Sequence, residues 1–126
     1  MDAQPSLIAF SPLDGGATGF AASVTVAGST SSSAATQLPG NTTNAVSSTP
    51  GEPLFYKQLQ VSNTTSAWAY INCGPLNTVA AATVAASYPV APGTVITMTI
   101  NGLSTGVTVI LGSGSGNVIF TRGQGL

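Results

Sequence analysis

Very few side chains in this sequence could carry acid–base or nucleophilic chemistry. The chain has 126 residues and no histidine, and its only charged side chains are Asp2, Asp14, Glu52, Lys57 and Arg122. General acid–base catalysis needs a positioned titratable group, most often histidine or a carboxylate. Without histidine, no Ser-His-Asp or Cys-His arrangement is possible, and a Ser-Lys pair would depend on the single lysine. We therefore expect that the protein is not an enzyme.

Sites for metals, cofactors and nucleic acids are equally short of ligands. Cys73 is the only cysteine, so an intrachain disulfide is excluded and a tetrahedral zinc site lacks its donors. The glycine run 112–116 lacks the Lys-Ser/Thr ending of a phosphate-binding loop, and it predicts a flexible hairpin connection. Two cations cannot drive binding to a phosphate backbone. We expect no metal, no cofactor and no nucleic-acid partner, with Cys73 acting as a small buried hydrophobe.

Targeting signals are weak throughout the sequence. Asn41-Thr42-Thr43 and Asn63-Thr64-Thr65 match the glycosylation tripeptide, which is common by chance in Thr-rich chains and matters only in a secreted protein. The apolar stretch 7–10 is short for a signal peptide and has no basic segment before it. No apolar run approaches the length of a membrane span. We expect a protein that is made in the cytoplasm and has no membrane partner.

Scarcity of charge is the most informative property of the composition. A folded chain of 12.4 kDa exposes about 6,000 Å² of surface, which five charged side chains cannot cover. Covering a neutral surface strips few ions of water, so such a surface suits permanent contact with other proteins. The composition therefore favours an assembly protein, and the alternative is a secreted Ser/Thr-rich domain that is simply uncharged.

Strand patterns dominate residues 54–126. In the stretch 54–62, Phe55, Leu59 and Val61 share one face, as the two-residue period of a pleated strand requires. In the stretch 68–73, Ala69, Ile71 and Cys73 alternate with Trp68, Tyr70 and Asn72. Further strands are expected at 23–27, 94–100, 106–111 and 117–121, the last three as an antiparallel meander.

Turns and a less regular stretch separate these strands. Ala91-Pro92-Gly93-Thr94 has the composition of a type II turn, in which glycine tolerates a positive φ. The stretch 79–86 is looser and could instead form one short helix, because alanine favours helices. Regular short strands separated by turns predict an all-β domain, an antiparallel β-sandwich or jelly roll over residues 23–126.

Residues 1–22 are expected to form an extended N-terminal arm. Its apolar side chains are Leu7, Ile8, Phe10, Leu13 and Phe20, and they would need a partner surface to bury against. The alternative is a disordered terminus.

Three segments resemble a family of small virion proteins of tailed phages, the head-decoration (cement) proteins. The first runs from Lys57 to Gly74, where a strand ending in Val61-Ser62-Asn63 leads through a polar turn into an aromatic strand. The second is the Pro-Val-x-Pro-Gly turn at 89–93. The third is the strand 118–122 with its Gly123-Gln124-Gly125 tail, so the resemblance covers about residues 55–126. Cys73 and Gln124 depart from the family pattern, which more usually has an aromatic and an acidic residue there.

The resemblance implies a structural protein that binds the outer surface of a phage capsid and bridges capsomers. It implies the major capsid protein as partner, a homotrimer at local three-fold positions, and a location on the virion after assembly in the host cytoplasm. The competing hypothesis is an adhesin-like or fibre-base module that binds a host receptor or glycan. In that case Trp68, Tyr70 and Tyr88 would form an exposed stacking platform, whereas in a cement protein they should be buried within the domain or at a contact.

Overall fold

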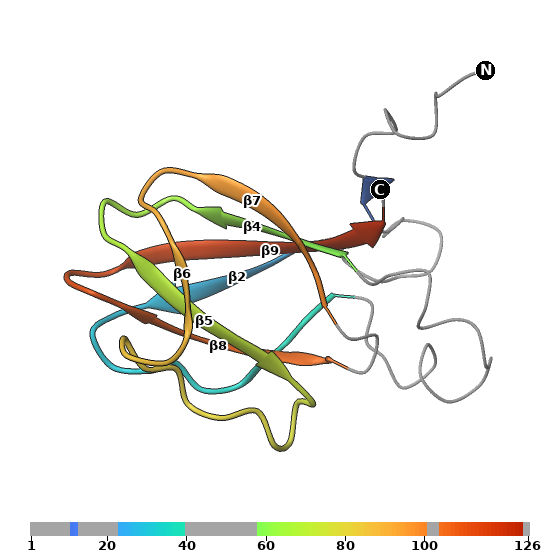
Figure 1. Cartoon of the computed structure of the whole chain (residues 1–126), viewed down its shortest axis with the longest axis horizontal. Coiled ribbons are helices and arrows are strands. Elements are labelled where there is room, and N and C mark those ends of the chain that lie inside the picture. Colours follow the sequence, from blue (N-terminus) through green and yellow to red (C-terminus); the bar gives the residue numbers. More distant parts are fainter. Residues whose placement is uncertain (1–10, 13–22, 40–57, 101–103, 125–126) are drawn as a thin grey trace.

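Two antiparallel sheets make up the part of the chain that the computed structural model describes, residues 11–12, 23–39, 58–100 and 104–124 (Figure 1). Sheet A contains β1 (Ser11–Pro12), β2 (Ser23–Gly28), β4 (Gln58–Asn63), β7 (Val95–Thr99) and β9 (Gly116–Gln124). Sheet B contains β3 (Thr36–Gln37), β5 (Ala69–Gly74), β6 (Tyr88–Val90) and β8 (Gly106–Leu111). No helix occurs within these ranges, so the prediction of an all-β fold is confirmed.

Sheet pairing differs from the expected meander of the last three strands. In sheet A, β9 is central, with β4 and then β7 on one side and β2 and β1 on the other. In sheet B the order is β3-β8-β5-β6. The meander prediction is therefore wrong, because β7 pairs with β4, β8 with β5 and β3, and β9 with β4, β2 and β1. Residues 112–115 accordingly connect β8 in sheet B to β9 in sheet A, so the prediction of a hairpin at 112–116 is wrong.

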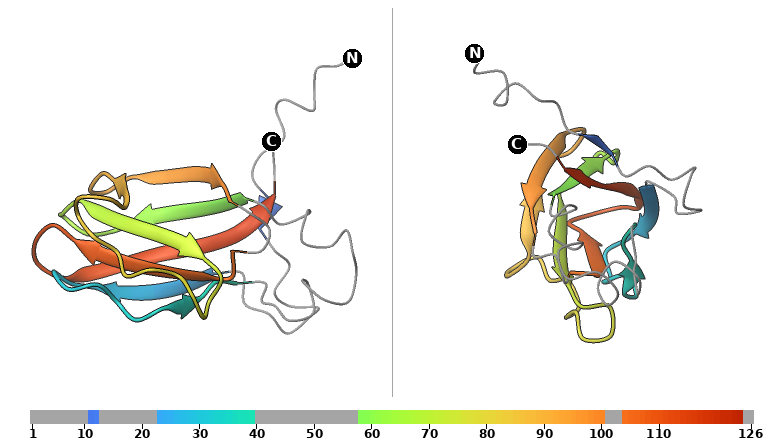
Figure 2. Two further views of the ribbon diagram at one scale, coloured as in Figure 1. Left: turned by 60° about the horizontal axis from the view of Figure 1, so that its bottom comes forward. Right: turned by 90° about the vertical axis from the view of Figure 1, so that its right-hand side faces the viewer.

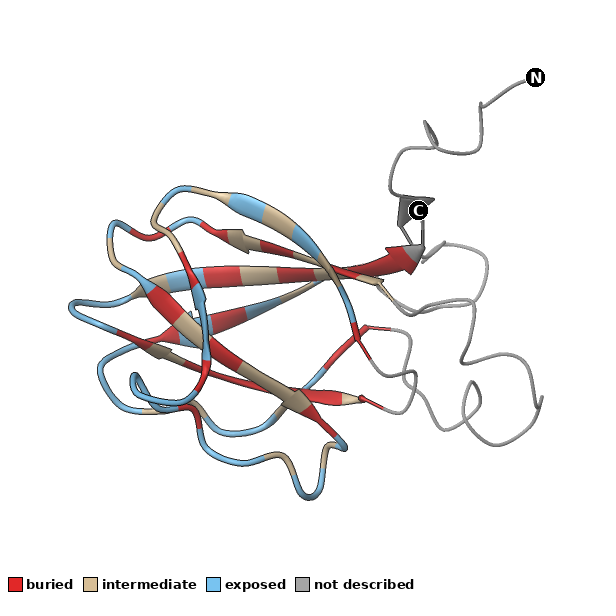
Figure 3. Ribbon diagram, in the orientation of Figure 1, coloured by how far each residue is buried: buried red, intermediate tan, exposed pale blue. Residues whose placement is uncertain are grey.

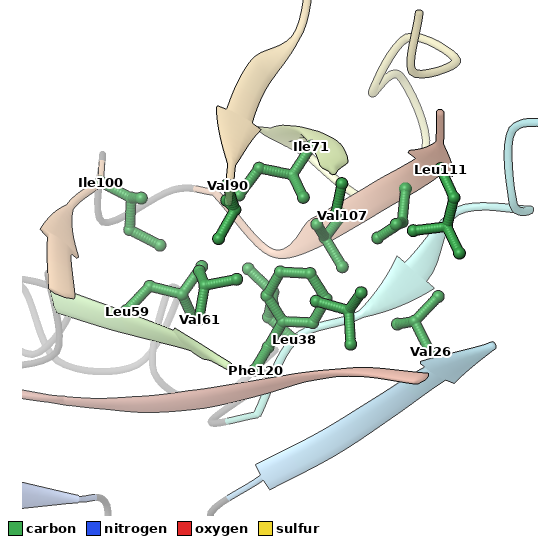
Figure 4. Close-up of a cluster of buried hydrophobic side chains, with 13 residues drawn as sticks. Val26, Leu38, Leu59, Val61, Ile71, Val90, Ile100, Val107, Leu111 and Phe120 are labelled. Atoms are coloured by element: carbon green, nitrogen blue, oxygen red, sulfur yellow. The ribbon is translucent and has the colours of Figure 1, made fainter. Parts of the chain in front are cut away.

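A single apolar core fills the space between the sheets (Figures 3 and 4). On sheet A, Phe120 of β9 lies opposite Val61 of β4 and Val24 of β2. Sheet B contributes Ile71 and Val109, which are paired in the β5–β8 ladder. β4 buries every second residue, as the pleat requires, whereas β8 buries Gly106, Val107, Thr108 and Val109 in succession. The sequence predicted which side chains of the stretches 54–62 and 68–73 share an apolar face. This is confirmed for Leu59, Val61, Ala69 and Ile71, which are at most 2% exposed.

The chain between β5 and β6 lies over the outer face of sheet B and contains no helix, so the alternative of a short helix at 79–86 is wrong. Thr108 of β8 donates its hydroxyl to the carbonyl of Ala80 at 2.7 Å, and Asn72 of β5 donates its Nδ2 to the same carbonyl and to that of Ala81. Gly106 permits the approach, because a Cβ at that position would lie 2.7 Å from the Cα of Leu76. This covering segment, residues 75–87, therefore shields one part of the outer face of sheet B.

Two further expectations concern the β6–β7 turn and the N-terminal arm. Gly93 has a φ of 66°, the positive value expected in the turn 91–94. Within the proposed arm 1–22 the structure describes only β1, whose Ser11 and Pro12 pair with Gln124 and Gly123 of β9. Leu7, Ile8, Phe10, Leu13 and Phe20 lie outside the described residues, as do Phe55 and Lys57. The arm and a jelly-roll connectivity stay predictions.

Candidate interaction surfaces

The outer face of sheet A is a surface of neutral side chains. Its residues are those that alternate with the core positions along β2, β9, β4 and β7. One row across the strands reads Thr25, Ile119, Ser62 and Val95, and the next reads Ser23, Thr121, Gln60 and Thr97. Hydroxyl and amide groups can exchange hydrogen bonds with a protein partner at a low desolvation cost, because no ion has to lose its water.

Arg122 is the only charged side chain among the described residues, and it faces inward. It lies opposite Leu59 in the β4–β9 ladder, is 5% exposed, and donates a hydrogen bond from its guanidinium Nη1 to the carbonyl of Ser104 at 2.7 Å. Burial lowers the pKa of the guanidinium, and the nearby Cys73 acts in the opposite direction to a smaller extent. Asp2, Asp14, Glu52 and Lys57 lie outside the described ranges. The surface of the described residues therefore carries no formal charge.

Cys73 is half-buried at the edge of the core, where the sequence predicted a buried small hydrophobe. Its side chain packs against the core cluster between the sheets. Burial raises the pKa of the thiol to about 11, and the positive charge of Arg122 only partly opposes that rise. A thiol with this pKa is protonated at neutral pH and is a poor nucleophile.

The part of the outer face of sheet B beside the covering segment carries an aromatic patch, defined here as Trp68, Tyr70, Pro89 and Ile110. Tyr70 lies opposite Ile110 on β8 and opposite Pro89 on β6, so these three side chains share one face. The N–H of Gly112 donates to the carbonyl of Trp68 at 2.9 Å, which extends the β5–β8 ladder by one pair. Trp68 is 48% exposed and Tyr70 is half-buried. A large aromatic flanked by neutral residues is the usual anchor of a protein contact.

Tyr88 does not belong to this patch. It is 52% exposed, but it lies opposite Ile71, whose side chain points into the core, so the register places Tyr88 on the other face of sheet B from Tyr70. Residues that are directly opposite each other in a ladder share a face. The structure thus brings Trp68 and Tyr70 together on one face and places Tyr88 apart from them.

Asn63 at the end of β4 is an organising residue whose role the sequence did not reveal. Its side chain is 1% exposed, and its Nδ2 donates to the carbonyls of Ala67, Val90 and Ala91 at 2.9–3.1 Å. Its Oδ1 accepts from the N–H and the hydroxyl of Thr65. The Val-Ser-Asn ending of the strand belongs to the motif that carries the resemblance. In the structure its asparagine binds backbone groups of the turns at 65–67 and 90–91. An amide used in this way is closed to glycosylation in the folded chain.

Among the described residues, no group of three or more His, Cys, Asp or Glu side chains gathers where it could hold a metal ion. The same part of the chain has no helix of the length and apolarity needed to cross a bilayer. Comparisons with protein-family models, with curated protein sequences and with solved structures found no match in any of the three.

Proposed function

We propose that this chain is a structural protein of a phage virion, a decoration protein that binds the outer surface of the capsid and stabilises it by bridging capsomers. The observation that carries the proposal is the charge distribution: the surface of the described residues has no charged side chain, and the one charged group in that part of the chain is buried. A surface of this kind is suited to lasting coverage by protein. The resemblance of residues 55–126 to cement proteins supports the same class.

The aromatic patch is the contact that we assign to the shell. It has the one tryptophan of the chain at its end, and it lies on sheet B, away from the neutral face of sheet A. Burying a half-exposed tryptophan in a pocket of the capsid protein would supply an anchor, while neutral neighbours exclude water. Residues 1–22 would add a second contact as an arm that reaches the shell or a neighbouring subunit.

Binding to heads tests the proposal directly. Purified protein is mixed with heads that lack it, and the bound fraction is measured by cosedimentation at low salt and at about 1 M NaCl. We expect saturable binding that salt does not weaken, because charge contributes little to the contact, and we expect decorated heads to lose their DNA at a higher temperature. Absence of binding, or binding abolished by salt, would contradict the proposal. Deleting residues 1–20 tests the arm separately.

The second candidate is an adhesin-like or fibre-base module that binds a host glycan or receptor. The exposure of Trp68 favours it, because aromatic rings that face solvent can stack on sugar rings. The separate position of Tyr88 reduces the expected platform of three rings to Trp68 and Tyr70. Binding of the isolated protein to host cells, together with failure to bind heads, would favour this candidate.

A further inference from the structure

One edge of sheet A is formed by β7, and its backbone groups can be assigned individually. The N–H of Asn63 donates to the carbonyl of Thr94 at 2.9 Å, so these two residues form a hydrogen-bonded pair at the end of the β4–β7 ladder. Such pairs alternate along an antiparallel ladder. Ile96 and Met98 therefore direct their N–H and C=O groups toward β4, and Val95, Thr97 and Thr99 direct theirs away from it.

No strand within the described ranges pairs with that outward side of β7 (Figure 2). On the opposite side of the fold, the chain after β2 closes onto β8 through bonds such as Ser33 N–H to the Val109 carbonyl at 2.8 Å. The edge of sheet B beside β7 is β6, which is three residues long and contains Pro89. Proteins usually protect an edge with proline, a charge or a very short strand. β6 has two of these protections, and β7, with the sequence VITMT, has none of the three.

We propose that two copies of this chain associate through β7, in an antiparallel pair whose two-fold axis passes beside Thr97. In this register Thr97 lies opposite Thr97 of the second copy, and Val95 lies opposite Thr99. All of the outward-pointing backbone groups then find partners, whereas a shift of one residue leaves some of them unpaired. The pairing would make one continuous sheet from the two copies of sheet A.

Side chains on both faces of this register are compatible with the pair. On the outer face the neighbours are Thr97 with Thr97 and Val95 with Thr99, all β-branched residues that suit cross-strand pairs. On the inner face Ile96 would lie beside Met98, and both are half-buried side chains at the margin of the core. β7 itself has no charged residue, and the net charge of −1 per chain causes little repulsion.

This inference goes beyond the proposed function, because it concerns the contact between two copies and not the contact with a shell. The trimer implied by the resemblance would require β7 to pair with a different edge, since a three-fold axis cannot place a residue opposite itself. Self-pairing at Thr97 is thus the distinguishing feature of the proposal. It can be tested on the purified full-length chain with no heads present.

The decisive experiment uses Thr97→Lys and Thr97→Glu variants, alone and mixed, with mass measured by light scattering and sedimentation over a concentration series. We expect the native chain to reach a dimer mass. Each variant alone should dimerise at least about tenfold more weakly, because like charges face each other across the axis. An equimolar mixture should recover the dimer, because a lysine from one copy then faces a glutamate from the other. A Thr99→Lys control places its charge opposite Val95 and should weaken the dimer less than Thr97→Lys.

A proline variant tests whether the outward-pointing backbone groups of β7 make the contact between the two copies. The N–H of Thr97 points away from β4, so Thr97→Pro removes an outward donor and leaves the β4–β7 ladder intact, as proline does on natural edge strands. We expect a folded monomer by circular dichroism and light scattering. A native chain that stays monomeric, a trimer, or a mixture of the Lys and Glu variants that fails to recover the association would each overturn the proposal. Pairing of β7 with an extended capsid segment instead would appear as a native monomer whose Thr97→Pro variant no longer binds heads.

Discussion

The side-chain amide of Asn63 donates to the carbonyl of Val90 at 3.0 Å, and this bond joins the end of β4 in sheet A to β6 in sheet B. The same amide also binds the carbonyls of Ala67 and Ala91, so one residue holds two turns against each other. Buried carbonyls that lose their donor cost free energy, since water cannot replace it. The asparagine therefore couples the sheets at one end of the core.

Asn63→Ala should lower the free energy of unfolding by about 3 kcal/mol, measured by urea denaturation, because it leaves several buried groups without partners. Asn72→Ala is the matched control, since Asn72 also donates to two carbonyls but from a half-buried position near solvent. We expect the control to cost about 1 kcal/mol or less. Equal losses for the two variants would contradict the special role of Asn63.

Asn63→Asp keeps the shape of the side chain but removes the amide that donates its hydrogen bonds. The variant keeps an oxygen toward Thr65 but turns the three donated bonds into contacts between a carboxylate and carbonyls. These contacts and burial raise the pKa of the new carboxyl in the folded state, so the loss of stability should be smallest at low pH, where the acid donates one hydrogen, and should grow as pH rises from the unfolded pKa toward the folded one. Denaturation at pH 4 and pH 7, with the native chain in parallel, should show this difference, and a pH-independent loss would contradict it.

Local periodicity predicted much of the fold, because a strand alternates its side chains regardless of its partner. Leu59 and Val61, as well as Ala69 and Ile71, face the core as the pattern indicated. Strand partners were not predictable in the same way. β8 and β9 are neighbours in the sequence and are joined by a glycine-rich stretch, so they look like a hairpin. Their apolar faces instead cover opposite sides of one core, and the chain crosses from sheet B to sheet A between them.

The charged residue of the C-terminal strand is buried, although charged side chains usually lie at the surface. A lone arginine among polar residues suggests a surface group, yet Arg122 follows Val118 and Phe120 at two-residue steps and faces inward with them. The alternation alone would have placed it correctly. For the surfaces, the sequence indicated neutrality and the paired aromatics Trp68 and Tyr70. It could not show that the register separates Tyr88 from them or that β7 forms an edge, because both facts depend on which strands meet.

Gly106 is where the covering segment approaches sheet B most closely. A methyl group there would lie 2.7 Å from the Cα of Leu76, which is a backbone atom and cannot rotate away. Gly106→Ala should therefore cost about 1–3 kcal/mol of stability by differential scanning calorimetry and denaturation. Gly112→Ala is the control, because its nearest neighbours would be 3.8 Å away, and we expect a change within about 0.5 kcal/mol. A stable Gly106→Ala variant would show that the segment moves aside freely.

The thiol of Cys73 should make stability depend on pH in alkaline solution. Its pKa is about 11 in the folded chain against 9.0 for an ordinary thiol, so between these values the unfolded chain has released a proton that the folded chain retains. The contribution is fully present below pH 9 and is lost as pH rises toward 11. Denaturation of the native chain and of Cys73→Ala over this range should give a steeper fall for the native chain. Identical slopes, or fast modification of the folded thiol by iodoacetamide at about pH 8, would contradict the raised pKa.

Trp68 distinguishes the shell contact from the rest of the surface. Because the side chain is 48% exposed, Trp68→Ala should cost only about 1 kcal/mol of stability, while an anchor in an interface usually contributes about 2 kcal/mol or more, or about thirtyfold in affinity. Tyr88→Ala is the matched control, with 52% exposure on the other face of sheet B. Cosedimentation with heads should weaken about thirtyfold or more for the tryptophan variant and stay near native for the tyrosine variant. If Trp68→Ala binds heads normally but the chain loses its attachment to host cells, the aromatic patch serves the adhesin function instead.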